Sequence, residues 1–455
     1  MKSWANDSVF YHIYPLGLCG APKENDFSLP VNYRLDKLYD WVDHLKDLGI
    51  NAMYLGPVFE SNSHGYDTKD YYQVDRRLGD NQSLAKLIAY LQDNGIRVIL
   101  DGVFNHVGRE FWAFKDVLEK QQDSKYCNWF AGLDFNYQSP YGDPFTYEAW
   151  EGHYNLVKLN LKNKDVKEYL FNAVKEWIDQ FNIDGLRLDA ADCLDKNFIV
   201  ELGELCRGIR SDFWILGEVI HGDYRKWAGA AMMDSITNYE CYKGLYSSHN
   251  DKNYFEIAYS LKRQFGEEGI YKHLPLYNFV DNHDVNRIST TLDNPAYLYP
   301  LHILLFTMPG VPSIYYGSEW GIEGKKIDGN DDPLRPELKI SKLAETSLHR
   351  DLVNVIKSLA DIRKNFESLR YGSYSEIFVD HQQFAFLREY EDEKLLVVVN
   401  SSDKALDLNL DIDLVGEYKL KDLLNGGEEF LIDNNKAKIK NISPYWGRIM
   451  KLEKQ

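Results

Sequence analysis

Residues 166–189 read VKEYLFNAVKEWIDQFNIDGLRLD, and this stretch indicates how the chain folds. Its first part carries an apolar side chain at every fourth position from Val166 to Ile178, so these side chains share one face of a helix. After a short turn, residues 185–188 form a largely apolar run with the length of a buried strand. The stretch therefore predicts an amphipathic helix followed directly by a strand, which is the repeating unit of an α/β protein.

The same unit occurs twice earlier in the chain. A helical stripe within residues 35–45 precedes a strand at 51–55, another within 84–91 precedes a strand at 97–100, and a glycine ends each helix. The other expected strands are at residues 9–14, 185–188, 213–217, 235–238, 276–280 and 311–316. Strands that alternate with helices in this way predict an α/β fold, a (β/α)8 TIM barrel.

Two segments depart from this alternation. Residues 107–164 are too long for one loop and poor in helical pattern, so we expect a small subdomain inserted after strand 3. Beyond residue 370, strand patterns at 384–387, 394–399 and 406–414 predict a C-terminal all-β sandwich. The expected domains are the first part of the barrel in residues 1–106, the inserted subdomain in 107–164, the rest of the barrel in 165–370 and the sandwich in 371–455.

The composition restricts the kind of ligand. Asp and Glu number 70 against 52 Lys and Arg, which gives a formal charge of -18, and no basic run offsets it. Such a chain repels nucleic acid and anionic lipid, so we expect neither nucleic acid nor a membrane as partner. Aromatic residues make up 14% of the chain, and flat rings with polar edges suit the apolar faces of sugars.

The cysteines and the N-terminal residues predict a cytoplasmic protein. The five cysteines form no Cys-x-x-Cys pair and match no zinc template, so we expect reduced thiols. The first seven residues, MKSWAND, lack the apolar stretch of a secretory signal. The longest apolar stretch lies between Pro300 and Pro309 and is too short to cross a bilayer.

Carboxylates gather where the predicted strands end. Asp189, Glu218 and Asp284 each follow a different strand, and His106 and His283 lie at strand ends as well. Side chains at the carboxyl ends of barrel strands meet at one face, so we expect these groups to surround one cleft. Paired carboxylates in a cleft are what cleavage of a glycosidic bond requires, one ionised to attack and one protonated to release the leaving oxygen.

Arg187 bears on the division of these roles. It lies two residues before Asp189 on one strand, so both side chains point to the same face, and its charge is expected to keep Asp189 ionised. Glu218 follows apolar residues and is expected to hold the proton. A lone Arg-x-Asp pair is usually structural, but three carboxylates and two histidines at strand ends favour a catalytic site.

These strand ends resemble the motifs of the α-amylase superfamily of glycoside hydrolases. The resemblance covers, in family order, DGVFNH at 101–106, GLRLD at 185–189, GE at 217–218 and FVDNHD at 279–284, and extends to GYD at 65–67, GVPSIYYG at 310–317 and YWGR at 445–448. Residues 116–130 resemble the neopullulanase and cyclomaltodextrinase branch. The N-terminal domain of that branch is expected to be lacking, because the first barrel strand begins near Val9.

The resemblance implies a role for each matching residue. It makes Asp189 the nucleophile, Glu218 the general acid/base and Asp284 the residue that grips and distorts the sugar ring. The substrate contacts that it further implies are Tyr66 beneath that ring, His106, Arg187 and His283 around it, and Arg335 with its acid partner Asp332. His221, shortly after Glu218, is a candidate on the leaving-group side.

No cofactor is required by this chemistry, and no metal ligand is assigned. The calcium site of secreted α-amylases uses the Asn of the first motif and a His shortly after the nucleophile. Asn105 is present, but residues 190–193 read AADC, so that calcium site is incomplete. The acidic run at 328–332 is the remaining candidate for a cation.

The expected activity is therefore that of a retaining glycoside hydrolase, a monomer or homodimer, acting on α-1,4 bonds in maltooligosaccharides, cyclodextrins or starch. Its covalent β-glycosyl intermediate on Asp189 requires the Asp189 and Glu218 carboxyls to lie about 5–5.5 Å apart. An α-glucanotransferase with the same residues and an α-1,6 or trehalose-type glucosidase stay open, although Ala190 after the nucleophile favours α-1,4 bonds. A catalytically dead glycan-binding scaffold is disfavoured, since it has no need of three carboxylates together.

Overall fold

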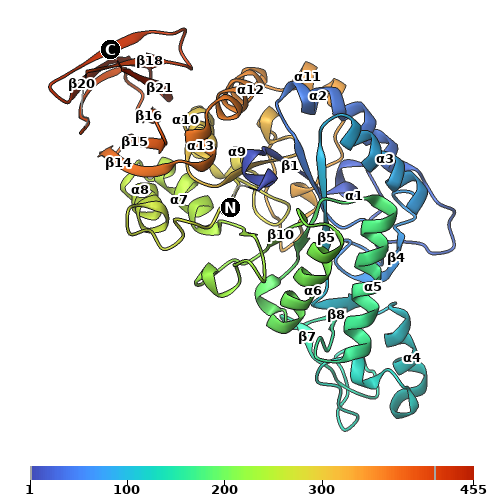
Figure 1. Cartoon of the computed structure of the whole chain (residues 1–455). Helices are drawn as coiled ribbons and strands as arrows, with labels where there is room; N and C mark the ends of the chain where they lie inside the picture. Colours follow the sequence, from blue (N-terminus) through green and yellow to red (C-terminus); the bar gives the residue numbers. More distant parts are fainter. Residues whose placement is uncertain (1–2, 414–416, 455) are drawn as a thin grey trace.

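The computed structural model describes residues 3–413 and 417–454, and its largest part is a parallel barrel (Figure 1). The barrel strands are β1 (Phe10–Ile13), β2 (Ala52–Leu55), β5 (Arg97–Gly102), β9 (Gly185–Leu188), β10 (Trp214–Gly217), β11 (Ser235–Ile236), β12 (Tyr277–Asn278) and β13 (Val311–Tyr315). They pair in the order β11-β10-β9-β5-β2-β1-β13-β12, and a parallel bridge between Thr237 and Tyr277 closes the ring. The expected eight-stranded barrel is confirmed.

Most of the helices cover the outside of this barrel, and α4 lies in the excursion after β5. The longer ones are α3 (Asn81–Asp93), α5 (Lys164–Phe181), α6 (Lys196–Ile209), α7 (Tyr239–Asn250), α8 (Phe255–Phe265), α10 (Leu298–Thr307) and α12 (Arg350–Asn365). The shorter ones are α1 (Pro15–Leu18), α2 (Val42–Asp47), α4 (Trp112–Lys120), α9 (Ile288–Thr291), α11 (Ile340–Thr346) and α13 (Glu367–Tyr371). The first expected helix is instead a 3-10 helix, η2 (Arg34–Trp41), that continues into α2, because its buried residues Leu35, Leu38 and Trp41 recur every third position.

Side chains point alternately to the two faces of each barrel strand, so they belong to two separate cores. Tyr11 on β1 and Met53 on β2 point outward beneath the helices, whereas Phe10, Ala52 and Trp214 fill the barrel interior. Nearer the carboxyl ends of the strands, two or four residues beyond these apolar positions, the side chains that point into the barrel carry polar groups. These buried residues are His12, Tyr54, Asp101, Arg187 and Glu218. The carboxyl end of the barrel is therefore a buried polar cluster above an apolar floor.

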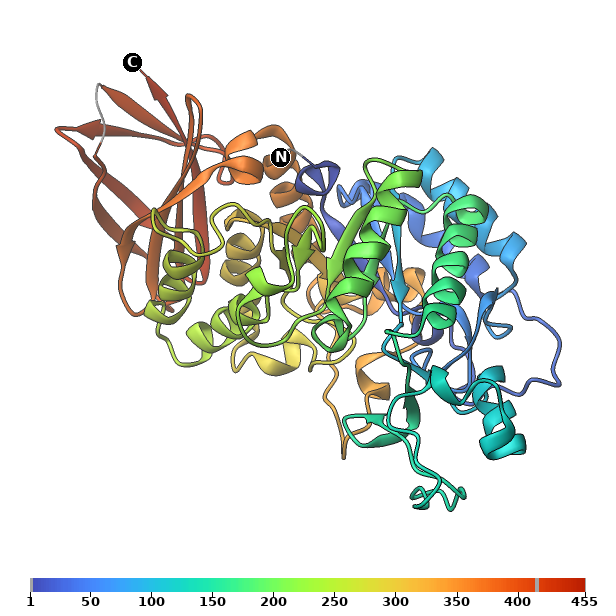
Figure 2. The same cartoon turned by 60° about the horizontal axis from the view of Figure 1, so that its bottom comes forward.

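The chain leaves the barrel after β5 and returns to it at α5. This excursion contains α4 and a small antiparallel sheet in the order β6 (His106–Gly108), β8 (His153–Lys158), β7 (Ala149–Trp150). A hairpin of β3 (Phe59–Ser61) and β4 (Thr68–Val74) follows β2. Figure 2 shows the excursion projecting from the barrel, away from the C-terminal strands.

The C-terminal domain is one antiparallel sheet of eight strands (Figure 1). The strands are β14 (Ser373–Val379), β15 (Gln383–Tyr390), β16 (Glu393–Asn400), β17 (Leu406–Asp411), β18 (Tyr418–Asp422), β19 (Glu429–Asp433), β20 (Lys436–Ile442) and β21 (Trp446–Lys454). The sheet curls so that its end strands β14 and β17 approach each other around an apolar core that includes Leu387, Leu396 and Met450. The expected all-β domain is confirmed as one continuous sheet; β17 ends at Asp411, and Leu414 of the expected strand 406–414 lies outside the described residues.

Two buried arginines lie where this sheet meets the barrel, and Arg388 links the two directly. Arg388 on β15 donates to the Thr307 carbonyl at the end of α10, and Arg363 on α12 donates to the Phe306 carbonyl one residue earlier. The remaining carbonyl partners are Gly372 and Ser373 for Arg388, and Leu369, Gly310 and Asn6 for Arg363. The guanidinium groups thus supply donors to a helix C-terminus, whose last carbonyls have no partners within the helix.

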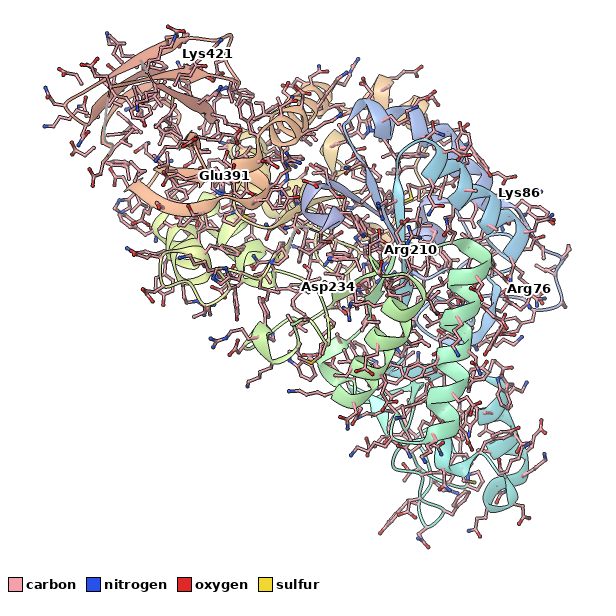
Figure 3. All side chains as sticks on the ribbon, in the orientation of Figure 1. Arg76, Lys86, Arg210, Asp234, Glu391 and Lys421 are labelled. Carbon is pink, nitrogen blue, oxygen red and sulfur yellow. The ribbon has the colours of Figure 1, made fainter. Side chains whose placement is uncertain are left out.

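Charged side chains lie on the outer faces, as Lys86 on α3 and Lys421 on β18 show (Figure 3). All five cysteines are free thiols, three of them buried. Across residues 3–413 and 417–454, no helix combines the length and the apolar character needed to span a membrane.

Candidate active site

Arg187 on β9 is the centre of the polar cluster at the mouth of the barrel. Its Nη1 donates to Asp101 at 2.9 Å and to Asp189 at 2.8 Å, and its Nη2 lies 2.7 Å from Glu218. Burial opposes the charge of the guanidinium, but Asp101 and Glu218 raise the pKa of Arg187 well above its ordinary value. One positive charge therefore faces three buried carboxyl groups.

Asp189 and Glu218 directly follow the neighbouring strands β9 and β10. Because both carboxyls bind one guanidinium, they are neighbours in one cleft, as the sequence predicted. Burial raises the pKa of Asp189 and that of Glu218 above their ordinary values, and Arg187 acts against both shifts. Arg187 thus favours the ionised form of Asp189, as expected, while burial acts in the opposite direction.

The two oxygens of Glu218 have different surroundings. Oε2 accepts from Arg187 and from the backbone N–H of Ala190 at 3.1 Å, whereas Oε1 faces the Tyr239 hydroxyl at 3.4 Å. The Tyr239 hydroxyl accepts in turn from Asn282 Nδ2 at 3.0 Å. A proton on Glu218 therefore belongs on Oε1, because Oε2 already accepts two donors. Sequence reasoning missed Tyr239 and did not use Asn282, although Asn282 lies inside the motif around Asp284.

Ala190 has a left-handed backbone, with φ 42 and ψ 48. This conformation costs an alanine roughly 1–2 kcal/mol. It aims the Ala190 N–H at Glu218 and directs the chain from Asp189 into the short turn Ala191–Cys193. Backbone strain at this point is thus tied to the placement of the acid.

Asp284 lies in the loop after β12, beside His283. Arg335 Nη2 donates to Asp284 at 2.9 Å, Arg335 Nε donates to the His283 carbonyl at 2.9 Å, and His283 Nε2 lies 3.0 Å from Asp284. Against the effect of partial burial, His283 and Arg335 hold the pKa of Asp284 well below its ordinary value. Asp284 is therefore an ionised carboxylate, which distinguishes it from the pair on Arg187.

Tyr66 and Tyr54 form the floor of the mouth. The Tyr66 hydroxyl donates to Asp101 at 3.0 Å and lies 2.5 Å from His283 Nε2, and its ring is stacked against His283. The Tyr54 hydroxyl donates to Asp101 at 2.7 Å, and His12 stacks on the Tyr54 ring at 4.2 Å. Sequence reasoning missed Tyr54 and His12, although both occupy inward positions on predicted strands.

An aromatic row leads outward from Asp189. His106 Nε2 lies 3.9 Å from Asp189, beyond hydrogen-bond distance, and burial lowers the pKa of His106 to about 3. The His106 ring faces Trp150 at 5.6 Å between ring centroids, and Trp150 stacks on His153. A neutral imidazole with two further rings beside it provides a surface suited to a second sugar residue.

Two of the expected contacts lie elsewhere. His221 is exposed on the turn after Glu218 and outside the hydrogen-bonded cluster. Asp332 pairs with Lys23, whereas Arg335 pairs with Asp331 at 3.1 Å in addition to Asp284. The sequence favoured the wrong one of two adjacent acids because the direction of their side chains depends on the short 3-10 turn Asp332–Leu334.

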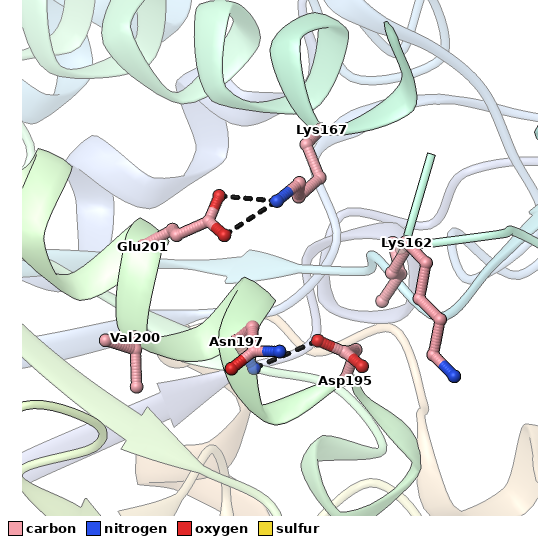
Figure 4. Close-up of a pocket in the computed structure, with 7 residues that line it drawn as sticks. Lys162, Lys167, Asp195, Asn197, Val200 and Glu201 are labelled. Carbon is pink, nitrogen blue, oxygen red and sulfur yellow. Dashed lines mark hydrogen bonds and ion pairs between the residues drawn. The ribbon is translucent and has the colours of Figure 1, made fainter. Parts of the chain in front are cut away.

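Within residues 3–413 and 417–454, no three His, Cys, Asp or Glu side chains are arranged to hold a metal ion. A hollow of about 240 Å³ lies between the N-terminal ends of α5 and α6 (Figure 4). It is lined by Lys167 and Glu201, which pair with each other, and by residues such as Asp195, whose side chain caps α6. These groups already satisfy one another, so the hollow adds nothing to the catalytic cluster.

Comparison with known proteins agrees with this geometry. The family "Alpha amylase, catalytic domain" matches residues 34–351, and "Maltogenic Amylase, C-terminal domain" matches residues 374–446. The cyclomaltodextrinase of Thermoanaerobacter pseudethanolicus is 32% identical over 96% of this chain and 78% of its own length.

Two solved structures are similar over almost the whole chain. A cyclomaltodextrinase superposes with a TM-score of 0.86 at 29% identity, covering 99% of this chain and 78% of its own. The cyclic alpha-maltosyl-(1→6)-maltose hydrolase of Arthrobacter globiformis has a TM-score of 0.81 at 26% identity and covers 99% of both chains. The barrel, the excursion after β5 and the C-terminal sheet thus occur together in known enzymes.

Proposed function

The chain belongs to the α-amylase family of glycoside hydrolases, and we propose that it hydrolyses α-1,4-glucosidic bonds of maltooligosaccharides and cyclodextrins with retention of anomeric configuration. The observation that carries this proposal is the binding of Asp189 and Glu218 to one guanidinium. A retaining mechanism needs two carboxyls close together, with one proton between them. Burial raises the pKa of Glu218, which favours its protonated form.

In the first step, the proton on Glu218 Oε1 passes to the glycosidic oxygen while a carboxylate oxygen of Asp189 attacks the anomeric carbon. The bond to the leaving sugar breaks with its electron pair on the protonated oxygen, and a β-glycosyl ester forms on Asp189. The ionised carboxylate of Asp284 stabilises the positive charge that develops on the ring.

In the second step, Glu218 is ionised and removes a proton from water, whose oxygen displaces Asp189 from the anomeric carbon. Glu218 regains its proton and Asp189 is released as carboxylate. Two inversions at one carbon retain the α configuration. Tyr239 donates toward Oε1 in this state, which stabilises the ionised form of Glu218.

The test uses maltoheptaose and β-cyclodextrin with the wild-type protein, a Glu218→Gln variant and a Glu201→Gln control on the remote hollow. We expect shorter products and ring opening with wild type and control, and at least about a hundredfold slower turnover with Glu218→Gln. Proton NMR of the first products should detect the α anomer before mutarotation. A β anomer, or equal rates for Glu218→Gln and wild type, would contradict the proposal.

A second candidate is a cyclic or branched substrate that contains α-1,6 bonds. The relative that matches this chain over 99% of both lengths is named for cyclic α-maltosyl-(1→6)-maltose. Turnover of that tetrasaccharide at a higher kcat/KM than β-cyclodextrin would favour this candidate. Products longer than seven sugars from maltoheptaose would instead favour a glucanotransferase with the same residues.

We propose further that turnover needs no metal ion, since arginine supplies the positive charge of the site. Activity unchanged by EDTA, with an unchanged melting temperature, is the expected result, and loss of activity restored by calcium would overturn it. Five free thiols support a reducing cytoplasmic location, which cell fractionation would test.

A further inference from the structure

A small cavity lies inside the barrel beneath the catalytic groups. Its volume is about 20 Å³, and its lining includes His12, His283, Glu218 and Arg187. A cavity of at least roughly 10–15 Å³ can hold one water molecule if two or more polar groups are present to bind it. This cavity therefore has the size of a single hydration site in a polar setting.

Two ring nitrogens at this cavity have no protein partner. His12 Nε2 and His283 Nδ1 are both buried and unpartnered, and the two rings are 5.1 Å apart and perpendicular. Both side chains are almost fully buried, at 3% and 2% exposure. Leaving such groups without any partner is costly, so buried nitrogens usually bind ordered water when protein offers nothing.

The surroundings of His283 define which nitrogen carries hydrogen. The Tyr66 hydroxyl donates to Asp101, so toward His283 the Tyr66 oxygen acts as acceptor, and the Asp284 carboxylate accepts as well. Nε2 faces these two acceptors and therefore bears the hydrogen. A partner at Nδ1 is then needed to keep the ring in this orientation.

Ring contacts fix the orientation of His12. Its ring is stacked on Tyr54 at 4.2 Å and lies against Tyr315 at 4.8 Å. Burial lowers the pKa of His12 well below its ordinary value, so the ring is neutral. An anion is disfavoured at this position because Arg187 is already bound by three carboxyls and Glu218 itself lines the cavity.

We propose that one water molecule occupies this cavity and bridges His12 Nε2 to His283 Nδ1, which makes His12 a positioning residue for the substrate-facing Nε2–H of His283. The kinetic part of this inference rests on the proposed glycosidase function. The hydration site itself rests on the cavity and the two unpartnered nitrogens.

The direct test is a crystal structure of the full chain at about 1.5 Å or better, which should contain one ordered water within hydrogen-bond distance of both nitrogens. Electron density with no water between the two rings would overturn the proposal. This measurement needs no substrate, so a water present in a protein inactive on every glucan would refute the proposed function and leave the hydration site standing.

Two variants test the positioning role. His12→Phe keeps a ring on Tyr54 and removes both nitrogens, and His12→Gln restores a polar atom. We expect His12→Phe to lower kcat about tenfold with a smaller change in KM, and His12→Gln to recover most of the loss. Nitrogen NMR of His283 should show a single Nε2–H tautomer in wild type and a mixture in His12→Phe.

His302→Phe is the matched control, because His302 is equally buried, has an unpartnered Nε2 and lies on α10 away from the mouth. We expect it to leave kcat and the His283 spectrum unchanged. Wild-type kcat together with an unchanged His283 spectrum in His12→Phe would overturn the positioning role, even if the water is present.

Discussion

The mouth of the barrel and its junction with the C-terminal sheet both bury arginine, but they satisfy it differently. At the mouth, Arg187 binds three carboxyl groups, and burial there raises the pKa of Asp189 and Glu218. At the junction, Arg363 and Arg388 bind backbone carbonyls at the end of α10, and burial lowers the pKa of each to about 9. All three guanidinium groups are charged at neutral pH.

This difference separates function from stability. The mouth holds more acid than base, an arrangement that costs folding free energy and that is typical of functional sites. The junction holds cations that complete the hydrogen bonding of a helix end, and through Arg388 this connects the two domains. Substitutions at the mouth should therefore affect chemistry, and substitutions at the junction should affect stability.

The largest expected effect tests the mouth. Asp189→Asn removes the proposed nucleophile, and we expect kcat on maltoheptaose to fall by about 10⁴-fold or more. The melting temperature should stay equal or rise, because one buried carboxyl no longer competes for Arg187. Stopped assays and calorimetry on the same preparation measure both quantities. A fall of several degrees in melting temperature with half the activity retained would mean that the mouth is structural.

At the junction, Arg388→Met leaves three carbonyls without their donor. We expect the free energy of unfolding to fall by about 3 kcal/mol, with kcat/KM unchanged within about twofold where the variant is folded. Urea unfolding measures the first quantity. Arg350→Met on the exposed start of α12 is the control and should change stability by less than about 0.5 kcal/mol. Equal effects of the two substitutions would contradict the assigned role of Arg388.

Acid should weaken the fold through two buried neutral histidines that lie outside the mouth. Burial lowers the pKa of His249 and of His302 to about 4, below the value near 6.5 of an unfolded chain. The unfolded state thus binds more protons between pH 6.5 and 4, so stability is complete above pH 6.5 and falls as the pH falls. The expected slope is up to about 1.4 kcal/mol per pH unit for each histidine.

Urea unfolding at pH 7.0, 6.0 and 5.0 measures this slope. A His302→Gln variant should lose part of it, since one proton fewer is bound on unfolding. A slope that is the same in wild type and variant would show that His302 does not contribute.

The smallest expected effect concerns backbone strain beside the nucleophile. Ala190→Gly removes the strain of an alanine in the left-handed conformation, and we expect the free energy of unfolding to rise by up to about 1 kcal/mol. Ala191→Gly, one residue later in the right-handed turn, should destabilise by a similar amount. Two changes of the same sign in urea unfolding would argue against strain at Ala190.

The barrel could be predicted because its strands leave a local signal. The run at 185–188 is reproduced as β9 with the same bounds, and the expected carboxylates follow β9, β10 and β12. Strands β11 and β12 are only two residues each, shorter than expected. After each strand the chain leaves the sheet, and the residues that follow include Tyr239 and Asp284 at the mouth.

The hydrogen-bonded partners of the carboxylates were harder to predict. Tyr239 reaches Glu218 only because α7 begins at that residue, and Asp331 rather than Asp332 meets Arg335 only through a local turn. Such contacts depend on how the elements pack in three dimensions, which the spacing of apolar residues along the sequence does not reveal. His12 is intermediate, since its inward direction follows from alternation on β1 but its partner across the barrel does not.

The C-terminal strand β21 ends at the side of the molecule away from the excursion after β5, as Figures 1 and 2 both show. A support or a fused protein attached at this end would leave the barrel mouth facing the surrounding solution. Immobilised in that orientation, the protein could meet long or cyclic glucans without an obstacle at its entrance. The curled sheet would then serve as a built-in spacer between the catalyst and its support.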